Sequence, residues 1–483
     1  MRTVNSINYL SPQFAVLSET QLQDLHLAAL ELLRKTGVRF FHSEALDMLN
    51  GAGAFISDRN LVKFPARLVE DALASVPPRI IMCDRSGAPG VYLEGLKVYF
   101  GTGSDCLNIL DYDTGERRKF TKQDIINGYR LCDALPNIHF VMSIGLPADV
   151  DPRLTYDVQM ALMLEQTSKP LVFVSNDKAS CQRAIDMAAA VAGGYDQLKE
   201  GQHILLYSEP SSPLQQSETA IDKLLLMADY ELPVVHSPGP LMGGTAPITM
   251  AAGLTMSLAE ILSGLVVHQL RNPGAPFVFG AGLHHMDMKA AQICYAAPEF
   301  QLTKGAIAEL GRWYGIPTWG YAGCSDAKVM DEQAAAEAML SIVMAKFTGA
   351  NLIHDVGYME SGLTGSYEMI VLSDELIGLA DHLIKGIEVN EETLMLDELH
   401  EIGPGGHFLN TESTHRHFRD FWYPSLLSRD IRETWEVDGE LTLGDRLTQK
   451  VKDLVYDHKP EPLESGIKKQ INEILKRADK ETQ

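Results

Sequence analysis

One stretch of the chain shows the architecture most clearly. It is residues 318–356, which read TWGYAGCSDAKVMDEQAAAEAMLSIVMAKFTGANLIHDV. An apolar run at 318–322 leads into a loop rich in small residues, a helical pattern follows at 332–348, and a second apolar run ends at Val356. A strand, a helix and another strand in this order are typical of a β-α-β unit, in which the two strands lie parallel.

The same alternation extends over most of the chain. Besides the two runs above, apolar runs occur at 98–101, 139–144, 171–174, 203–207, 234–237 and 277–280. Helical patterns follow them at 122–135, 155–165, 181–192, 218–230, 248–270, 298–314, 332–348 and 368–385. Eight such pairs predict an α/β protein built on a closed (β/α)8 TIM barrel, and an open doubly wound sheet is the alternative.

The rest of the chain flanks this repeating region. Residues 97–388 are interpreted as the barrel domain, and residues 1–96 are expected to form a helical N-terminal cap. The cap is expected to be helical because apolar residues recur along one helix face at 20–35 and again at 64–74. Residues 389–483 lose the barrel period and are expected to form a helical C-terminal extension.

The charge balance argues against several classes of partner. The chain has 483 residues, with 64 Asp and Glu against 41 Lys and Arg, and a formal net charge of −23. Nucleic acids and anionic membranes are bound through clustered basic side chains, so neither is expected as a partner. The apolar segment 251–270 contains Glu260 and His268, and it is interpreted as a buried core helix rather than a membrane span.

The cysteines and histidines give no metal signature. The six cysteines are scattered, and none stands in a CxxC or CxH spacing. The neighbours His284 and His285 do not change this, because adjacent residues of an extended segment point to opposite sides. We therefore expect no bound metal, free thiols and a cytoplasmic location.

The active site is expected where the barrel strands end, because catalytic groups of such barrels project from the C-terminal ends of the strands. Aromatic side chains stand at many of these ends: Tyr207, Phe279, Trp319, Tyr321 and Tyr358. Ring faces attract quaternary ammonium groups by roughly 0.5–2 kcal/mol per ring. The alternative for each ring is that it fills a layer of the barrel interior.

Carboxylates accompany the rings at these strand ends. They are Asp105, Glu209, Asp326, Asp355 and Glu360. Such groups are suited to balance a bound cation or to orient a histidine, and the alternative for each is a helix N-cap.

Several blocks of sequence, taken together, resemble one family. They are GIPTWGYAGCSDAKVMDEQAA at 315–335, TGANLIHDVGYMESG at 348–362, GPGGHFL at 403–409, HRHF at 415–418 and FWYP at 421–424. These blocks are similar to the trimethylamine methyltransferase superfamily, and the likeness covers nearly the whole chain. The resemblance implies a (β/α)8 barrel that moves a methyl group to a corrinoid (cobalamin) cofactor carried by a separate partner protein.

The chain departs from the archaeal trimethylamine enzymes of that family in one respect. Those enzymes carry pyrrolysine near the end of a late barrel strand, whereas this chain has ordinary residues in the matching region, 320–324. Members without pyrrolysine resemble quaternary-amine demethylases. The resemblance therefore implies glycine betaine as the first expected methyl donor, with proline betaine, carnitine and butyrobetaine as alternatives.

The resemblance gives each strand-end residue an expected role. The aromatic walls around the ammonium group are expected to be Tyr207, Phe279, Trp319, Tyr321 and Tyr358. The groups expected near a substrate carboxylate are His284, His285, His354 and Lys328, with Asp326, Asp355 and Glu360 to balance or orient them. Among these, the residues interpreted as catalytic are His354, Asp326 and Glu360. The glycines expected to admit the corrin ring are Gly101, Gly243, Gly244 and Gly323.

Two other functions remain open from the sequence. The same barrel suits a lyase or hydrolase that uses His354 and Asp355 as acid and base. It also suits a betaine-binding protein without catalytic activity. The acidic surface and the exposed helices permit a homodimer.

Overall fold

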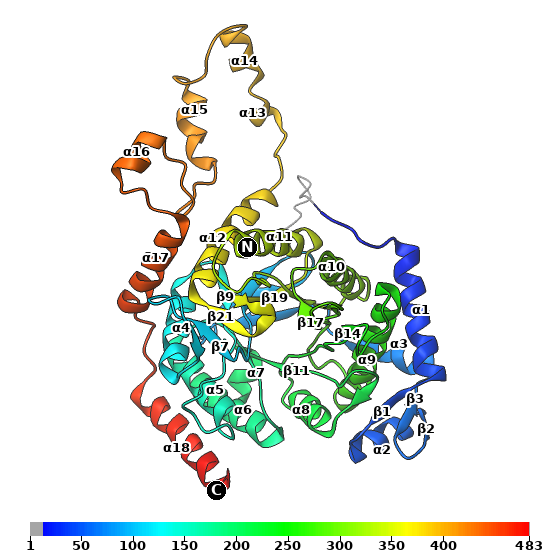
Figure 1. Ribbon diagram of the computed structural model, residues 1–483. Helices are drawn as coiled ribbons and strands as arrows, with labels where there is room; N and C mark the ends of the chain where they lie inside the picture. Colours follow the sequence, from blue (N-terminus) through cyan, green and yellow to red (C-terminus); the bar gives the residue numbers. More distant parts are fainter. Residues whose placement is uncertain (1–12, 483) are drawn as a thin grey trace.

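Eight parallel strands close into a barrel at the centre of the molecule (Figure 1). The computed structural model describes residues 13–482. In barrel order the strands are β6 (Tyr99–Thr102), β9 (Ile138–Phe140), β10 (Leu171–Phe173), β11 (Ile204–Ser208), β13 (Val234–His236), β15 (Phe277–Val278), β18 (Trp319–Tyr321) and β19 (Leu352–Val356). Two parallel bridges, Val141 to Leu171 and Phe279 to Thr318, join the two halves, and β19 pairs with β6. The predicted (β/α)8 barrel is confirmed.

A helix follows each barrel strand, as the alternating pattern predicted. These helices are α4 (Lys122–Ala134), α5 (Thr155–Gln166), α6 (Lys178–Ala192), α8 (Glu218–Asp229), α9 (Met250–Arg271), α10 (Pro298–Trp313), α11 (Glu332–Thr348) and α12 (Tyr367–Leu383). A short helix, α7 (Tyr195–Glu200), comes after α6. Local chemistry fixes their starts: Thr121 and Asp124 form a capping box on α4, and the Asp331 carboxylate accepts hydrogen bonds from the first turn of α11.

Helix α9 is long and apolar enough to cross a membrane by length and composition alone. Most of that helix is buried inside the protein, where it packs against other helices of the fold. This is the position expected for the core helix predicted at 251–270.

A β-hairpin closes the N-terminal end of the barrel. It consists of β4 (Ile80–Cys83) and β5 (Pro89–Leu93). Its apolar side chains share one buried cluster with the barrel interior, which includes Leu205 and Val278. The Cys83 amide donates to the Gln202 carbonyl oxygen, just before β11 begins. The hairpin therefore fills the N-terminal end of the barrel interior with apolar side chains.

The N-terminal segment is less helical than the sequence pattern predicted. It contains the helices α1 (Glu19–Lys35), α2 (Ser43–Gly51) and α3 (Ala66–Ser75), together with the strands β1 (Val38–Phe40), β2 (Phe55–Ser57) and β3 (Leu61–Lys63). Strand β1 pairs with β12 (Gln215–Gln216), far along the chain. Three-residue strands are too short to show a periodic pattern, so the sequence did not predict them. The first twelve residues of the expected cap lie outside the described residues.

The C-terminal segment runs along the barrel and also extends away from it (Figure 1). The projecting part contains the short helices α13 (Glu391–Leu394), α14 (Leu396–Ile402), α15 (Glu412–His417), η2 (Phe418–Asp420) and α16 (Arg432–Val437). Helix α17 (Leu443–Asp457) then packs on α4 and α12, and α18 (Ser465–Thr482) packs on α5 and α6.

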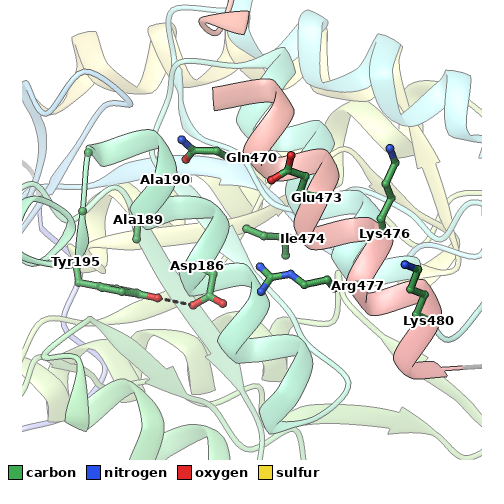
Figure 2. Close-up of a pocket in the computed structure, with 12 residues that line it drawn as sticks. Asp186, Ala189, Ala190, Tyr195, Gln470, Glu473, Ile474, Lys476, Arg477 and Lys480 are labelled. Carbon is green, nitrogen blue, oxygen red and sulfur yellow. Dashed lines mark hydrogen bonds between the residues drawn. The ribbon is translucent and has the colours of Figure 1, made fainter. Parts of the chain in front are cut away.

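Figure 2 shows a groove of about 890 Å³ between α6 and α18. Its residues on α6 belong to the C-terminal half of that helix, and α6 runs back from the mouth of the barrel towards the other end. The Tyr195 hydroxyl there donates to an Asp186 carboxylate oxygen over 2.8 Å. This groove is therefore remote from the strand ends where chemistry is expected.

Small sheets cover the C-terminal mouth of the barrel. One contains β7 (Asn108–Leu110), β8 (Arg117–Lys119), β20 (Tyr358–Met359) and β21 (Thr364–Ser366), and the short helix η1 (Glu360–Gly362) follows β20. The other contains β14 (Leu241–Met242), β16 (His284–Asp287) and β17 (Gln292–Cys294). Segments that follow β6, β13, β15 and β19 therefore converge on the mouth.

Candidate active site

A cavity of about 430 Å³ lies at the C-terminal ends of the barrel strands. Its lining comes from nearly every side of the barrel: Ser104, Asp105, Tyr156, Val174, Tyr207, Ser208, Glu209, Lys223, Gly239, His284, Tyr295, Tyr321, His354, Asp355, Tyr358, Ser361, Gly362 and Leu363. The lining is dominated by rings and carboxyl groups. Its position is the one that barrel enzymes use for catalysis.

The rings form a contiguous wall. The centroids of Tyr321 and His354 lie 4.3 Å apart, and His284 lies 4.9 Å from Tyr295 and 5.8 Å from Tyr321. Tyr358 extends this wall, 6.2 Å from Tyr295. These spacings are those of packed aromatic groups, so the ring faces are held in place before any ligand arrives.

A glycine admits Tyr358 into the wall. Any Cβ atom at Gly103 would collide with the Tyr358 ring, and the Tyr358 hydroxyl donates to the Ser104 carbonyl oxygen. The backbone after β6 can therefore approach the ring closely only because residue 103 has no side chain.

His354 is held in one tautomer. Its Nδ1 lies 2.9 Å from the Gly320 carbonyl oxygen, which accepts hydrogen bonds and never donates them, so Nδ1 carries a proton. Burial lowers the pKa of His354 to about 3, which leaves the ring neutral with an acceptor lone pair on Nε2. Asp355 Oδ1 lies 3.1 Å from that Nε2. The contact therefore requires a proton on Asp355.

Asp355 is the most constrained carboxyl group of the site. It is 1% exposed, its φ angle is +75°, and its second oxygen, Oδ2, is buried without a partner among the described residues. Burial raises the pKa of Asp355 well above its ordinary value, in agreement with the proton that His354 requires. A left-handed backbone and an unpartnered buried oxygen in one residue are typical of functional sites.

Asp105 faces the same cavity from the loop after β6. Its φ angle is +66°, and its carboxylate accepts hydrogen bonds from the Tyr156 hydroxyl over 3.0 Å and from the Ser143 hydroxyl over 3.3 Å. Burial raises the pKa of Asp105 to about 6, although the two hydroxyl groups act in the opposite direction. Asp105 is therefore able to change its charge close to neutral pH.

Glu209 adds a third carboxyl group at the end of β11. It accepts a hydrogen bond from the Tyr207 hydroxyl. Its side chain is exposed to the cavity, and protein atoms surround the cavity at this point. This environment raises the pKa of Glu209, and nearby Asp105 acts in the same direction. Three carboxyl groups thus share one cavity with a wall of rings.

Six of the predicted site residues line this cavity. They are Tyr207, His284, Tyr321, His354, Asp355 and Tyr358. Trp319 lies one layer deeper, fully buried, with its ring 4.3 Å from His354 and 5.6 Å from Tyr207. It supports the wall from behind instead of forming its surface.

Four further predicted residues point elsewhere. Phe279 faces outward to α10, where it contacts Gly311 and Tyr314, because successive strand residues alternate between the two faces. His285 follows His284 on β16 and is directed away from the cavity for the same reason. Lys328 is exposed and donates to the Asp326 carbonyl oxygen, and Glu360 forms an ion pair of 2.7 Å with Arg117.

Asp326 acts on the cavity through its neighbours. Its carboxylate accepts hydrogen bonds from the backbone amides of Tyr295 over 2.8 Å and Ala296 over 3.0 Å, and from the Ser361 hydroxyl over 2.7 Å. Tyr295 and Ser361 both line the cavity. Asp326, predicted as a catalytic residue, therefore positions the wall and does not touch the cavity itself.

The four glycines predicted to admit a corrin ring are not among the lining residues. Gly101 and Gly323 are buried, and side chains of the barrel wall pack against them, Phe140 on Gly101 and Val356 on Gly323. Gly243 and Gly244 are exposed in a turn after β14. Packing and turn geometry account for these glycines in the structure.

Sequence reasoning missed three lining residues that do not stand at strand ends. Tyr156 and Lys223 come from the helices α5 and α8, and Tyr295 comes from the loop after β17. Both helices begin at the mouth of the barrel, which brings Tyr156 in the first turn of α5 and Lys223 in the second turn of α8 to the cavity. Asp105 and Glu209, by contrast, carried a visible signal, because both are carboxylates that follow predicted strands.

No group of three or more His, Cys, Asp or Glu side chains in residues 13–482 is arranged to hold a metal ion. The functional groups among the lining residues of the cavity are ring faces, carboxyl groups, hydroxyl groups and one lysine.

Comparison with known proteins identifies relatives over the whole chain. The family model described as Trimethylamine methyltransferase (MTTB) matches residues 1–483. A trimethylamine methyltransferase of Desulfitobacterium hafniense (strain DSM 10664 / DCB-2) is 30% identical over 468 residues, which cover 97% of this chain and 94% of that protein. A glycine betaine methyltransferase of Desulfitobacterium hafniense (strain Y51) is 27% identical over 475 residues, covering 98% of each.

A solved structure shows the same fold. The monomethylamine methyltransferase of Methanosarcina barkeri superposes with a TM-score of 0.56 at 13% identity, covering 97% of this chain and 88% of that chain. At this identity the likeness concerns the fold alone.

Proposed function

Because the chain belongs to the trimethylamine methyltransferase family, whose members pass methyl groups to corrinoid proteins, we propose that it demethylates a quaternary amine. The acceptor is the cobalt of a corrinoid that a separate protein carries. The observation that carries the proposal is the cavity at the strand ends, in which tyrosine rings and three carboxyl groups surround one space. A quaternary nitrogen has no N–H group to donate, so ring faces and negative charge are the means by which a protein recognises it.

The residues of the cavity account for binding and orientation. In this proposal the faces of Tyr295, Tyr321 and Tyr358, which line the cavity, contact the methyl groups of the ammonium ion, at roughly 0.5–2 kcal/mol per ring. Asp105 and Glu209 supply negative charge to the same space. Positioning of this kind converts a collision between two molecules into an oriented encounter, which is a large part of the rate enhancement of such transfers.

The bond changes place few demands on acids or bases. The C–N bond breaks with its electron pair remaining on nitrogen, so the leaving group is a neutral tertiary amine that needs no proton. The electron pair of the new bond to the methyl carbon comes from the reduced corrinoid. A neutral His354, with its pKa at about 3, agrees with a site that donates no proton. Positive charge on nitrogen disappears in the transition state, which a cavity shielded from water favours.

Glycine betaine is the substrate that the resemblance suggests, with proline betaine, carnitine and butyrobetaine as alternatives. We also propose a cytoplasmic location, where the six cysteines, all free in the structure, stay reduced.

A direct assay tests this function. The full chain is incubated with chemically reduced cobalamin and a panel of quaternary amines, and methylcobalamin is followed by its absorbance. We expect methylcobalamin and the demethylated amine in equal amounts with at least one quaternary amine. Trimethylamine and a reaction without protein serve as controls. If no quaternary amine yields methylcobalamin, with free cobalamin or with a corrinoid protein, the proposed function is wrong.

A further inference from the structure

The charge of the cavity identifies a narrower class of substrate within the proposed function. Three carboxyl groups line the cavity, and Lys223 is the one lysine or arginine among its lining residues. The two histidines add no positive charge, because burial lowers the pKa of both His284 and His354 to about 3. The lining is therefore acidic.

No lysine or arginine in the described part of the chain forms an ion pair with any of these three carboxyl groups. Asp105 is paired with the hydroxyls of Tyr156 and Ser143, and Glu209 is paired with the hydroxyl of Tyr207. Asp355 Oδ1 lies 3.1 Å from Nε2 of the neutral His354 ring, and its Oδ2 is buried with no hydrogen-bond partner in the described part of the chain.

Two other buried carboxylates are each paired with an arginine. Asp157, whose side chain is fully buried, forms an ion pair of 2.7 Å with Arg183, and the largely buried Asp124 forms one of 2.7 Å with Arg118. A buried carboxylate is costly unless a cation compensates it. The cavity is thus a place where the fold concentrates carboxyl groups and supplies no arginine, which points to a cation from outside.

The single lysine of the lining is poorly placed to hold a second anion. Lys223 is 8% exposed, and its ammonium donates to the Ser175 carbonyl oxygen over 3.0 Å. It belongs to α8 and is the nearest available counter-charge for Glu209 and Asp105. Lys304 lies behind the wall, where its ammonium donates to the Tyr321 carbonyl oxygen. A substrate carboxylate would meet Asp105 and Glu209 and would compete with both of them for Lys223, whereas Asp355, which carries a proton, neither repels nor attracts it.

An uncharged polar group on the substrate finds a more suitable partner in the cavity than a substrate carboxylate does. The Ser208 hydroxyl lines the cavity, is buried, and has no hydrogen-bond partner in the described part of the chain. A buried hydroxyl without a partner is destabilising, and a ligand hydroxyl satisfies it without adding negative charge.

From this arrangement we propose that the methyl donor is a quaternary amine of net positive charge, with no carboxylate and with a hydrocarbon or hydroxylated tail. The inference rests on the proposed function. It predicts that the site binds betaines, which carry a carboxylate, more weakly than choline-like amines. The reason is that like charges in contact strongly oppose binding.

Calorimetric titration of the full chain with three probes tests this class. The probes are choline, tetramethylammonium and glycine betaine, at pH 8. We expect choline and tetramethylammonium to bind at least about 30-fold more tightly than glycine betaine, which corresponds to one uncompensated like-charge contact. Equal or tighter binding of glycine betaine overturns the inference. Should glycine betaine both bind tightly and yield methylcobalamin, the proposed function stands while this inference fails.

A charge-removing variant makes the test specific. Glu209→Gln is expected to weaken choline binding about tenfold and to leave glycine betaine binding unchanged or stronger. The ratio between the two dissociation constants therefore becomes smaller. Glu200→Gln removes the same charge from an exposed position on α7 and is the matched control, with no change expected. If Glu209→Gln does not fold, as judged by circular dichroism, Asp105→Asn takes its place with the same expected narrowing. An unchanged preference in the folded variant overturns the inference.

Discussion

Asp105 makes the affinity for a quaternary cation depend on pH in a way that can be calculated. Its pKa is raised to about 6, and a cation is bound by the ionised form. Because only the ionised form binds the cation, the apparent dissociation constant of the quaternary amine rises about tenfold when the pH falls from 8 to 5. Glu209, whose pKa is also raised by burial, acts in the same direction. The quaternary nitrogen has no titratable proton, so the change of the dissociation constant with pH is caused by groups of the protein.

The substitution Asp105→Asn isolates this contribution. Asparagine tolerates the φ angle of +66° and still accepts the hydrogen bond from the Tyr156 hydroxyl, so the local geometry is retained. We expect the variant at pH 8 to bind choline about as weakly as the wild type does at pH 5, and to show a smaller pH slope. The assay is calorimetric titration at pH 5, 6, 7 and 8, with Glu200→Gln as the control.

Stability provides an independent readout of the same carboxyl group. The pKa of Asp105 is higher in the folded protein than its ordinary value of 3.8, so the folded state loses stability as the pH rises through about 6. Without ligand, Asp105→Asn should therefore be at least as stable as the wild type at pH 8, by up to about 3 kcal/mol. A wild-type affinity that is flat between pH 5 and 8, or a variant that keeps the full slope, refutes the reasoning.

Three further predictions concern residues around the cavity and in the core. Trp319→Ala should lower the free energy of unfolding by about 3–5 kcal/mol, because the ring is fully buried behind His354, and an unchanged denaturation midpoint would contradict that position. Asp326→Asn should raise the KM for the quaternary amine several-fold with little change in thermal midpoint, since the carboxylate holds the backbone of Tyr295; equal KM values would show that the wall does not depend on it. Glu260, buried in α9, has a pKa raised by burial to about 7 from an ordinary 4.5, so the stability present below pH 4.5 is lost as the pH rises through 7. Glu260→Gln should remove up to about 3 kcal/mol of that pH dependence, measured by denaturant unfolding at pH 5 and 8, and a variant that retains it would exclude Glu260 as the cause.

The barrel could be predicted from the sequence because its strands are buried on both faces. Strand β10 (LVF) is buried at all three positions and β13 begins with two buried valines, so both appear in the sequence as short apolar runs. The small strands β1, β2 and β3 could not be predicted, because each spans three residues and β1 pairs with a segment about 175 positions away.

The height of a ring along the barrel axis is the main quantity that could not be predicted from the sequence. Trp319 and Tyr321 are two residues apart on β18 and both point inward, yet Tyr321 reaches the cavity and Trp319 lies a layer below it. Period-two alternation explains why Phe279 faces outward, but it contains no information on height along the barrel axis. The sequence therefore indicates which rings stand near the strand ends, but not which of them reach the cavity.

Among the charged residues of the cavity, the sequence predicted Asp355 but not Lys223. Asp355 was predicted in the site from its position at a strand end, and the structure adds the tautomer of His354 and the proton that Asp355 must carry. Lys223 had no signal at all, because a lysine in the second turn of a helix is usually solvated. Only the closed barrel brings its side chain to the cavity.

The central claim is that the cavity recognises a permanent positive charge, and one pair of ligands tests it most directly. Choline and 3,3-dimethylbutan-1-ol have nearly the same shape, and they differ in a charged nitrogen against a neutral carbon. Calorimetric titration of the full chain with both at pH 8 should show choline binding at least about 100-fold more tightly, since several ring faces and carboxyl groups act only on the cation. Equal dissociation constants for the two alcohols would contradict the account.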